Sequence, residues 1–219
     1  MAVPKAFLFD LNGTMIDDMG YHQKVWYDIL NNDLKAGLSR EAVKKQMYGK
    51  NSELFARVFG EGHFTEAEVD KWSMEKERRY QQVYLPELRL IAGLDTFLEK
   101  AKKQGIVLAI GSAAIPFNID FVLDNLSIRP YFSAVVSADD VKIAKPDPEV
   151  YLKLAGILNI KPSECLVFED APKGVEAAAN AGMQSVVITT MHEPGEFAQY
   201  DNVWGYIADY NDKRLDGLF

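Results

Sequence analysis

The chain has 219 residues, of which 48% are hydrophobic and 26% are charged, a composition typical of a globular protein with a sizeable core. Its formal net charge of -8 argues against nucleic acid or an anionic membrane as the main partner. No apolar run approaches the ~18 residues of a membrane span, so we expect no membrane partner. The single cysteine, Cys165, excludes an internal disulfide and favours a reducing compartment, and we therefore expect a cytoplasmic protein.

The first predicted element is a short apolar strand, Phe7 to Phe9, which runs into Asp10. After a turn, residues 17–85 show helical periodicity that no convincing strand interrupts. The helical segments are YHQKVWYDIL, EAVKKQM, SELFARVF and EAEVDKWSMEKERRYQQVYL, the last with Val69, Trp72 and Val83 as its apolar positions. Its arginines, Arg78 and Arg79, are expected on a solvated face.

From Pro86 onward, predicted helices and strands alternate. GLDTFLEKAKKQG is an amphipathic helix that ends at Gly105, and IVLAIGS is a continuous apolar strand buried on both faces. The later strands are SAVVSADD, CLVFED, QSVVITT and WGYIADY, and the later helices are PFNIDFVLDNL, DPEVYLKLAGILN and APKGVEAAANAG. Such alternation predicts an α/β fold with a doubly wound parallel sheet.

The opening strand belongs to this sheet, so the helical block is an insertion. We predict an α/β core domain from residues 1–16 and 88–219, and a small all-helical cap domain from residues 17–87. Ligands of doubly wound sheets bind outside the carboxyl ends of the strands. The functional side chains are therefore expected at those ends.

Polar side chains follow four of the predicted strands: Asp10, Ser112, Lys145, and the pair Glu169 and Asp170. Taken singly, each has an ordinary explanation, such as a helix cap for the acidic pair or a turn for the serine. Taken together, three carboxylates at one sheet edge would repel one another unless a cation lies between them. Oxygen ligands of this kind favour Mg²⁺. A lysine and a serine beside such a cation suit phosphoryl transfer.

The order and spacing of these motifs resemble the haloacid dehalogenase (HAD) superfamily. Within it, the chain is similar to the β-phosphoglucomutase-like phosphatases and phosphohexomutases, which have a Rossmann-like core and a small helical cap of the C1 type. The four matching segments are FDLNGTMID with Asp10, AIGS with Ser112, KPDPEVY with Lys145, and FEDAPKGVEAAANAG with Glu169 and Asp170.

The resemblance implies that Asp10 attacks phosphorus and forms an aspartyl-phosphate, while Ser112 and Lys145 hold the transferring group. Mg²⁺ would be held by Asp10, the main-chain carbonyl of Asn12, and the pair Glu169 and Asp170. The resemblance places His22 in the hinge region, near position 12. The candidate substrate-binding residues are Gly13, Thr14, His22, Lys50, Lys76 and Ala113.

The chain departs from the family pattern in two respects. Asn12 stands where the family has its general acid/base aspartate, and an amide cannot give or take that proton, which typically costs ~10²–10⁴ in rate. Ser52 stands where the mutases carry a phosphate-binding arginine, and Ala113 to Ile115 replace their polar residues after the serine. The changes at Ser52 and at Ala113 to Ile115 argue against a hexose-phosphate mutase.

The function we expect is a Mg²⁺-dependent HAD-like phosphatase acting on a small phosphorylated metabolite, with turnover slowed by Asn12. Three alternatives stay open: a β-phosphoglucomutase-like sugar-phosphate mutase, a phosphonate hydrolase that uses the cap lysine Lys50, and a catalytically weak phosphometabolite-binding protein. A metal-free dehalogenase is disfavoured, because it would not need Glu169 and Asp170. We expect a monomer.

Overall fold

The computed structural model describes residues 3–47 and 51–219. The chain divides into two compact units, which are described separately. The α/β unit comprises Met1–Asp17 and Leu88–Phe219, and the helical unit comprises Asp18–Glu87. No helix of the described residues has the length and apolar character needed to cross a membrane.

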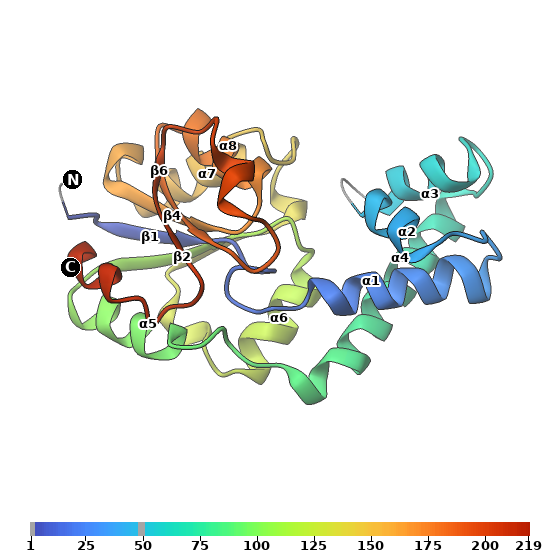
Figure 1. Ribbon diagram of the computed structural model, residues 1–219, viewed down its shortest axis with the longest axis horizontal. Helices are drawn as coiled ribbons and strands as arrows, with labels where there is room; N and C mark the ends of the chain where they lie inside the picture. Colours follow the sequence, from blue (N-terminus) through green and yellow to red (C-terminus); the bar gives the residue numbers. More distant parts are fainter. Residues whose placement is uncertain (1–2, 48–50) are drawn as a thin grey trace. The chain divides into compact units, whose positions relative to one another are not determined.

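The α/β unit is built on a six-stranded parallel sheet with the strand order β3-β2-β1-β4-β5-β6 (Figure 1). This order reverses direction at β1, as expected of a doubly wound sheet, and the predicted fold class is confirmed. The strands are β1 (Ala6–Phe9), β2 (Val107–Gly111), β3 (Ala134–Val136), β4 (Cys165–Glu169), β5 (Gln184–Ile188) and β6 (Val203–Ile207).

Helices cover both faces of the sheet (Figure 1). α7 (Glu149–Leu158) and α8 (Pro172–Asn180) cover one face, and α5 (Leu94–Lys103) and α6 (Pro116–Asn125) cover the other. The unit also contains short 3-10 turns at Arg129–Tyr131, Ala138–Asp140, Pro162–Glu164, Pro194–Phe197 and Lys213–Leu218. Because both faces are covered, the central strands are continuous apolar runs rather than alternating ones.

The two faces of β1 have different partners. Ala6 and Leu8 pack in a cluster of mainly aliphatic residues with α7 and α8. Phe7 points to the opposite face, where its ring stacks on Phe97 of α5 at a centroid distance of 5.4 Å. Phe9 lies on the same face and stacks on Phe168 at 4.7 Å. β1 is therefore fixed from both sides, which fixes the residue that follows it.

All regular elements of the helical unit among the described residues are helical: α1 (Met19–Asp28) and its wider final turn (Ile29–Asp33), α2 (Arg40–Gln46), α3 (Asn51–Phe59), α4 (Glu66–Tyr84) and a 3-10 turn (Leu85–Glu87). α4 begins with a capping box, in which Thr65 accepts from the backbone of Glu68 and the Glu68 side chain accepts from Thr65. This cap explains why a long, charged helix starts where it does.

The buried side of α4 carries charged as well as apolar residues. Val69, Trp72 and Val83 are only partly buried, and the buried residues of this helix are Lys76, Glu77, Tyr80 and Tyr84. Charged residues can occupy a buried face when they are paired, as Lys76 and Glu77 are at 2.9 Å.

The two arginines of α4 differ from each other. Arg78 is exposed, as expected, but Arg79 is partly buried and forms ion pairs with Asp28, Asp33 and Glu75. Arg79 therefore joins α4 to the end of α1 instead of facing only solvent.

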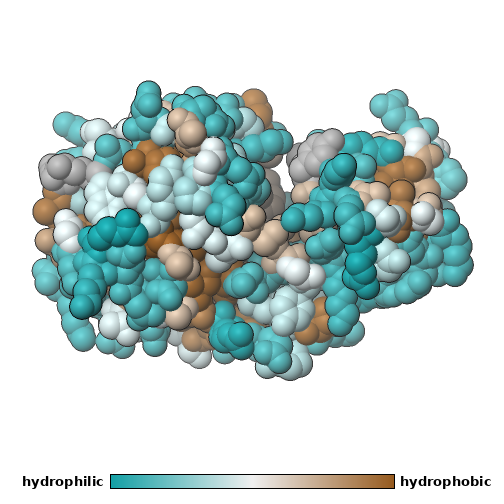
Figure 2. Space-filling model, in the orientation of Figure 1, coloured by the Kyte–Doolittle hydropathy of each residue, from teal (hydrophilic) through white to brown (hydrophobic). Residues whose placement is uncertain are grey.

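The surface of the protein in this view is mainly hydrophilic (Figure 2).

Leu98→Ala should lower the free energy of unfolding by about 2–5 kcal/mol, because Leu98 is fully buried in α5 and its loss leaves a cavity. Leu152→Ala is the matched control, since Leu152 lies in α7 with 42% of its surface exposed, and its effect should stay below about 0.5 kcal/mol. Urea unfolding followed by circular dichroism measures both. Equal losses in the two variants would contradict the burial described here.

Candidate active site

The loop after β1 brings Asp10 to the carboxyl edge of the sheet. The Asp10 amide donates to the Phe168 carbonyl at 2.9 Å, so the ladder between β1 and β4 continues up to this residue. Gly13 then turns the chain with φ of 76°. A Cβ at Gly13 would overlap the Asp170 carboxylate, so only glycine allows this loop to lie so close to it.

The carboxylates of Asp10, Glu169 and Asp170 form one cluster. β1 and β4 are neighbours in register, with Phe9 opposite Phe168, so the residues that follow them meet. One ligand atom from each carboxylate lies within 4.8 Å of the others, and all three residues are buried. Burial, followed by the charges of Glu169 and Asp10, raises the pKa of Asp170 well above its usual value.

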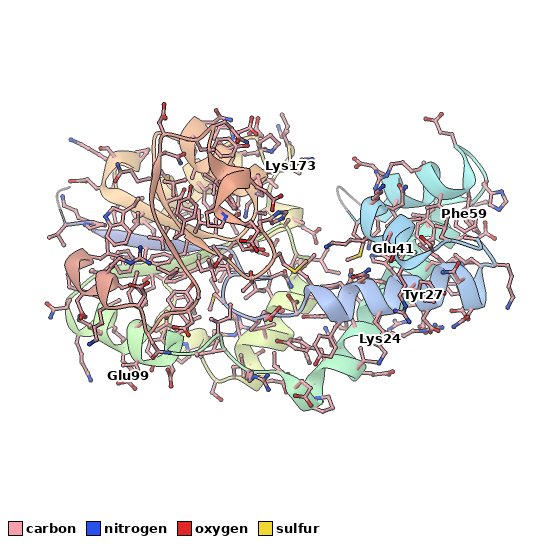
Figure 3. The ribbon with its side chains drawn as sticks, in the orientation of Figure 1. Lys24, Tyr27, Glu41, Phe59, Glu99 and Lys173 are labelled. Carbon is pink, nitrogen blue, oxygen red and sulfur yellow. The ribbon has the colours of Figure 1, made fainter. Side chains whose placement is uncertain are left out.

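Lys145 lies among these carboxylates. Its Nζ donates to Asp10 Oδ1 at 2.6 Å, to Glu169 Oε1 at 2.7 Å and to the Gly111 carbonyl at 3.1 Å. Burial alone would lower the pKa of Lys145, but the two carboxylates outweigh it and raise the pKa well above its usual value. The lysine therefore remains a cation. By contrast, Lys173, labelled in Figure 3, is exposed in the first turn of α8.

Ser112 lies at the end of the neighbouring strand β2. Its backbone amide donates to the Val136 carbonyl at 3.0 Å, and its Oγ accepts from the Ala114 amide at 3.1 Å. The side chain is buried, and the Ala113 side chain that follows is exposed. Since β2 pairs with β1, Ser112 belongs to the same sheet edge as Asp10.

The turn that carries Asn12, Gly13 and Thr14 is held by side chains from three directions. The Thr14 hydroxyl donates to Asp170 Oδ1 at 3.1 Å. Thr190 donates to the Gly13 carbonyl at 2.6 Å, and Tyr210 donates to the Thr14 carbonyl at 3.0 Å. The backbone of Asn12 forms an isolated parallel β-bridge with Ile16.

Several residues that support the site were not predicted from the sequence. Thr190 follows β5 closely, so the strand-end rule could have found it, whereas Tyr210 carried no comparable signal. Tyr151 was also missed, although its hydroxyl donates to Glu169 Oε1 at 3.0 Å. Gly174 was read only as part of a helix, but a Cβ there would overlap the Glu169 carboxylate.

The helical unit brings His22 and Lys76 together. Lys76 Nζ lies 2.7 Å from His22 Nδ1 and 3.0 and 2.9 Å from the two Glu77 carboxylate oxygens, and His22 Nε2 lies 3.2 Å from Asp18. Burial, then the charge of Lys76, lowers the pKa of His22 against the influence of Asp18. Burial also lowers the pKa of Lys76, although the charge of Glu77 acts to raise it. Lys50 lies outside the described residues.

An α/β sheet with a largely buried lysine and three buried carboxylates at its carboxyl edge has the architecture of a phosphoryl-transfer hydrolase. The chain belongs to the haloacid dehalogenase-like hydrolases, whose family model matches residues 4–182. The resemblance noted from the sequence is confirmed, and the protein is an enzyme of the hydrolase or phosphomutase type.

Individual relatives agree with this assignment. The chain is 32% identical to β-phosphoglucomutase of Bacillus subtilis, over 83% of this chain and 82% of the relative. It is 28% identical to fructose-1-phosphate phosphatase YqaB of Escherichia coli, over 82% and 93%. In fold, it is similar to a family IA HAD hydrolase of Entamoeba histolytica, with a TM-score of 0.88, 24% identity, and coverage of 98% and 97%.

Gly174→Ala should lower the melting temperature, because the new methyl group would displace the Glu169 carboxylate. This is the reverse of the usual effect, since alanine stabilises a helix interior by about 1 kcal/mol relative to glycine. Gly156→Ala is the matched control, because nothing lies within 4 Å of its added Cβ in α7. It should raise the melting temperature in the same thermal denaturation assay. An equal gain in both variants would contradict the close contact at Glu169.

Proposed function

We propose that the protein is a Mg²⁺-dependent phosphatase of small sugar phosphates, with Asp10 as the nucleophile and the helical unit as a cap. The observation that carries this proposal is the pairing of Lys145 with Asp10 beside Asp170. This pairing brings together a proposed nucleophile, Asp10, a fixed cation, Lys145, and a proposed metal-binding carboxylate, Asp170. The relatives named as a phosphoglucomutase and a fructose-1-phosphate phosphatase support a sugar phosphate as the substrate class.

The donor set fits Mg²⁺, which prefers hard oxygen ligands. The proposed ligands are the carboxylates of Asp10 and Asp170 and the main-chain carbonyl of Asn12, with Glu169 as a further anion of the set. Three ionised carboxylates against one ammonium leave two negative charges, which a divalent cation would neutralise. When bound, the metal would offset the negative charge of the phosphoryl oxygens.

In the first step, an Asp10 carboxylate oxygen attacks phosphorus and the bond to the sugar oxygen breaks, which leaves an aspartyl-phosphate on Asp10. Lys145 would hold the transferring group by charge, and Ser112 would offer a hydroxyl donor beside it, while the Thr14 hydroxyl stays on Asp170. In the second step, water attacks the same phosphorus, so that phosphate leaves and the Asp10 carboxylate is restored.

Asn12 limits both steps. The leaving sugar oxygen needs a proton and the attacking water must lose one, and an amide side chain can do neither. The proton must therefore come from solvent and return to it. We propose that the enzyme is slow, with release of the aspartyl-phosphate as its slower step for substrates with good leaving groups.

Gly13 and Ala113 are the proposed sugar-binding residues of the α/β unit, and His22, Lys50 and Lys76 are those of the helical unit. The ring nitrogens of His22 already contact Asp18 and Lys76. With its lowered pKa, His22 is a poor proton donor at neutral pH, which supports the view that it does not replace the missing acid.

A sugar-phosphate mutase is the second candidate, supported by the 32% identity to a β-phosphoglucomutase. Ser52 and the apolar run Ala113 to Ile115 weigh against it, because Ser52 lacks the positive charge of an arginine and the apolar run lacks the polar groups expected for a second phosphate. A phosphonate hydrolase based on Lys50 and a phosphometabolite-binding protein are the remaining alternatives. Assays on sugar monophosphates, a bisphosphate and phosphonoacetaldehyde distinguish them.

Asn12→Asp should raise turnover of sugar phosphates by roughly 10²–10⁴, because it restores a general acid and base. Asp10→Asn should abolish turnover, and removal of Mg²⁺ by a chelator should do the same in every variant. Phosphate release from a panel of sugar phosphates, with and without Mg²⁺, measures these effects.

Asp139→Asn is the matched control for the loss of a carboxylate, since Asp139 is exposed and outside the cluster, and its turnover should equal that of the parent. Brisk turnover in the parent with no gain in Asn12→Asp would show that another group transfers the proton. No turnover in any variant would favour the binding protein.

A further inference from the structure

The Glu169 carboxylate is surrounded by protein donors. Its Oε1 accepts from Lys145 at 2.7 Å and from the Tyr151 hydroxyl at 3.0 Å. Its Oε2 accepts from the backbone amides of Asp170 at 3.0 Å and Ala171 at 3.1 Å. A carboxylate has about four acceptor positions, so these four donors use its full capacity. Glu169 is thus held in one orientation.

Among these four donors, Tyr151 is the one that belongs to a helix packed on a face of the sheet. It lies in α7, is fully buried, and belongs to the cluster of mainly aliphatic residues between α7, α8 and the strands. A phenol is an O–H donor at neutral pH. Its position in the helix pattern is that of a core residue, yet its hydroxyl reaches the site.

The same side chain also contacts Lys145 through its ring. The Lys145 ammonium lies 5.0 Å from the centre of the Tyr151 ring, within the range of a cation–π interaction. Tyr151 therefore touches Glu169 with its hydroxyl and Lys145 with its face. These two residues are in turn bonded to each other, so the three form a closed set of contacts.

Packing leaves the Tyr151 ring little freedom. On one side is Gly111, where an added Cβ would lie 3.4 Å from the ring and 2.9 Å from Leu154. On the far side of the carboxylate, Gly174 allows no side chain at all without overlap with Glu169. The backbone at Gly174 therefore confines the Glu169 carboxylate, and full burial confines the Tyr151 ring.

We propose that Tyr151 is a positioning residue that fixes Glu169, and through it the Lys145 ammonium, for contact with the phosphoryl group. Glu169 then acts on the site mainly through Lys145 and the backbone at Asp170. The expected effect of Tyr151 on turnover rests on the proposed phosphatase function.

Tyr151→Phe tests the proposal, since it keeps the ring and its packing and removes only the hydroxyl. In supporting shells of this kind, loss of a partner typically costs 10–100-fold in affinity or activity. We expect roughly a tenfold fall in kcat with KM changed less than about twofold, and roughly a tenfold loss of inorganic phosphate affinity by calorimetry in the presence of Mg²⁺.

Tyr200→Phe is the matched control, because the Tyr200 hydroxyl also donates to a glutamate, Glu176, at 3.3 Å outside the site. It should change neither quantity. A Tyr151→Phe variant that melts earlier but keeps the parental kcat and phosphate affinity would overturn the proposal and leave Tyr151 a core residue.

The calorimetric measurement separates this inference from the proposed function. If the parent enzyme fails to turn over any sugar phosphate, the proposed function fails, but weaker phosphate binding in Tyr151→Phe alone still supports the positioning role. Equal phosphate binding in the parent, Tyr151→Phe and Tyr200→Phe would contradict that role whatever the activity.

Discussion

One largely buried positive charge organises the carboxyl edge of the sheet. Lys145 pairs with Asp10 at 2.6 Å and with Glu169 at 2.7 Å, in a site where three carboxylates would otherwise repel one another in a medium that screens them poorly. The lysine alone leaves excess negative charge, which adds to the effect of burial in raising the pKa of Asp170. The proposed divalent cation follows from that imbalance as much as from the ligand types.

The topology determines where this charge cluster forms. β1 lies at the centre of the sheet between β2 and β4, so residues that end three neighbouring strands meet without help from long loops. Glycine then sets the close approaches: Gly13 lets the β1 loop lie against Asp170, and Gly174 lets α8 lie against Glu169. The proposed chemistry depends on these backbone contacts as well as on the charged groups.

Much of this site could be predicted from the sequence. Asp10, Ser112 and the acidic pair follow apolar runs, and a parallel sheet brings such ends together. Tyr151 could not be found this way, because its helix position is that of a core residue and only the tertiary structure shows its hydroxyl. The burial of Lys76 and Glu77 in α4 could not be predicted for a similar reason: their ion pair allows burial of residues that a hydrophobicity pattern assigns to solvent.

The central claim is that Asp10 accepts the phosphoryl group. Because Asn12 cannot activate water, the aspartyl-phosphate should outlast the first step and be open to trapping. The direct measurement is acid quenching of the enzyme with a reactive sugar phosphate and Mg²⁺, followed by peptide mass spectrometry. The account predicts one phosphoryl group on the peptide that contains Asp10. Steady turnover with no phosphorylated peptide, or with the phosphoryl group on another residue, would contradict it.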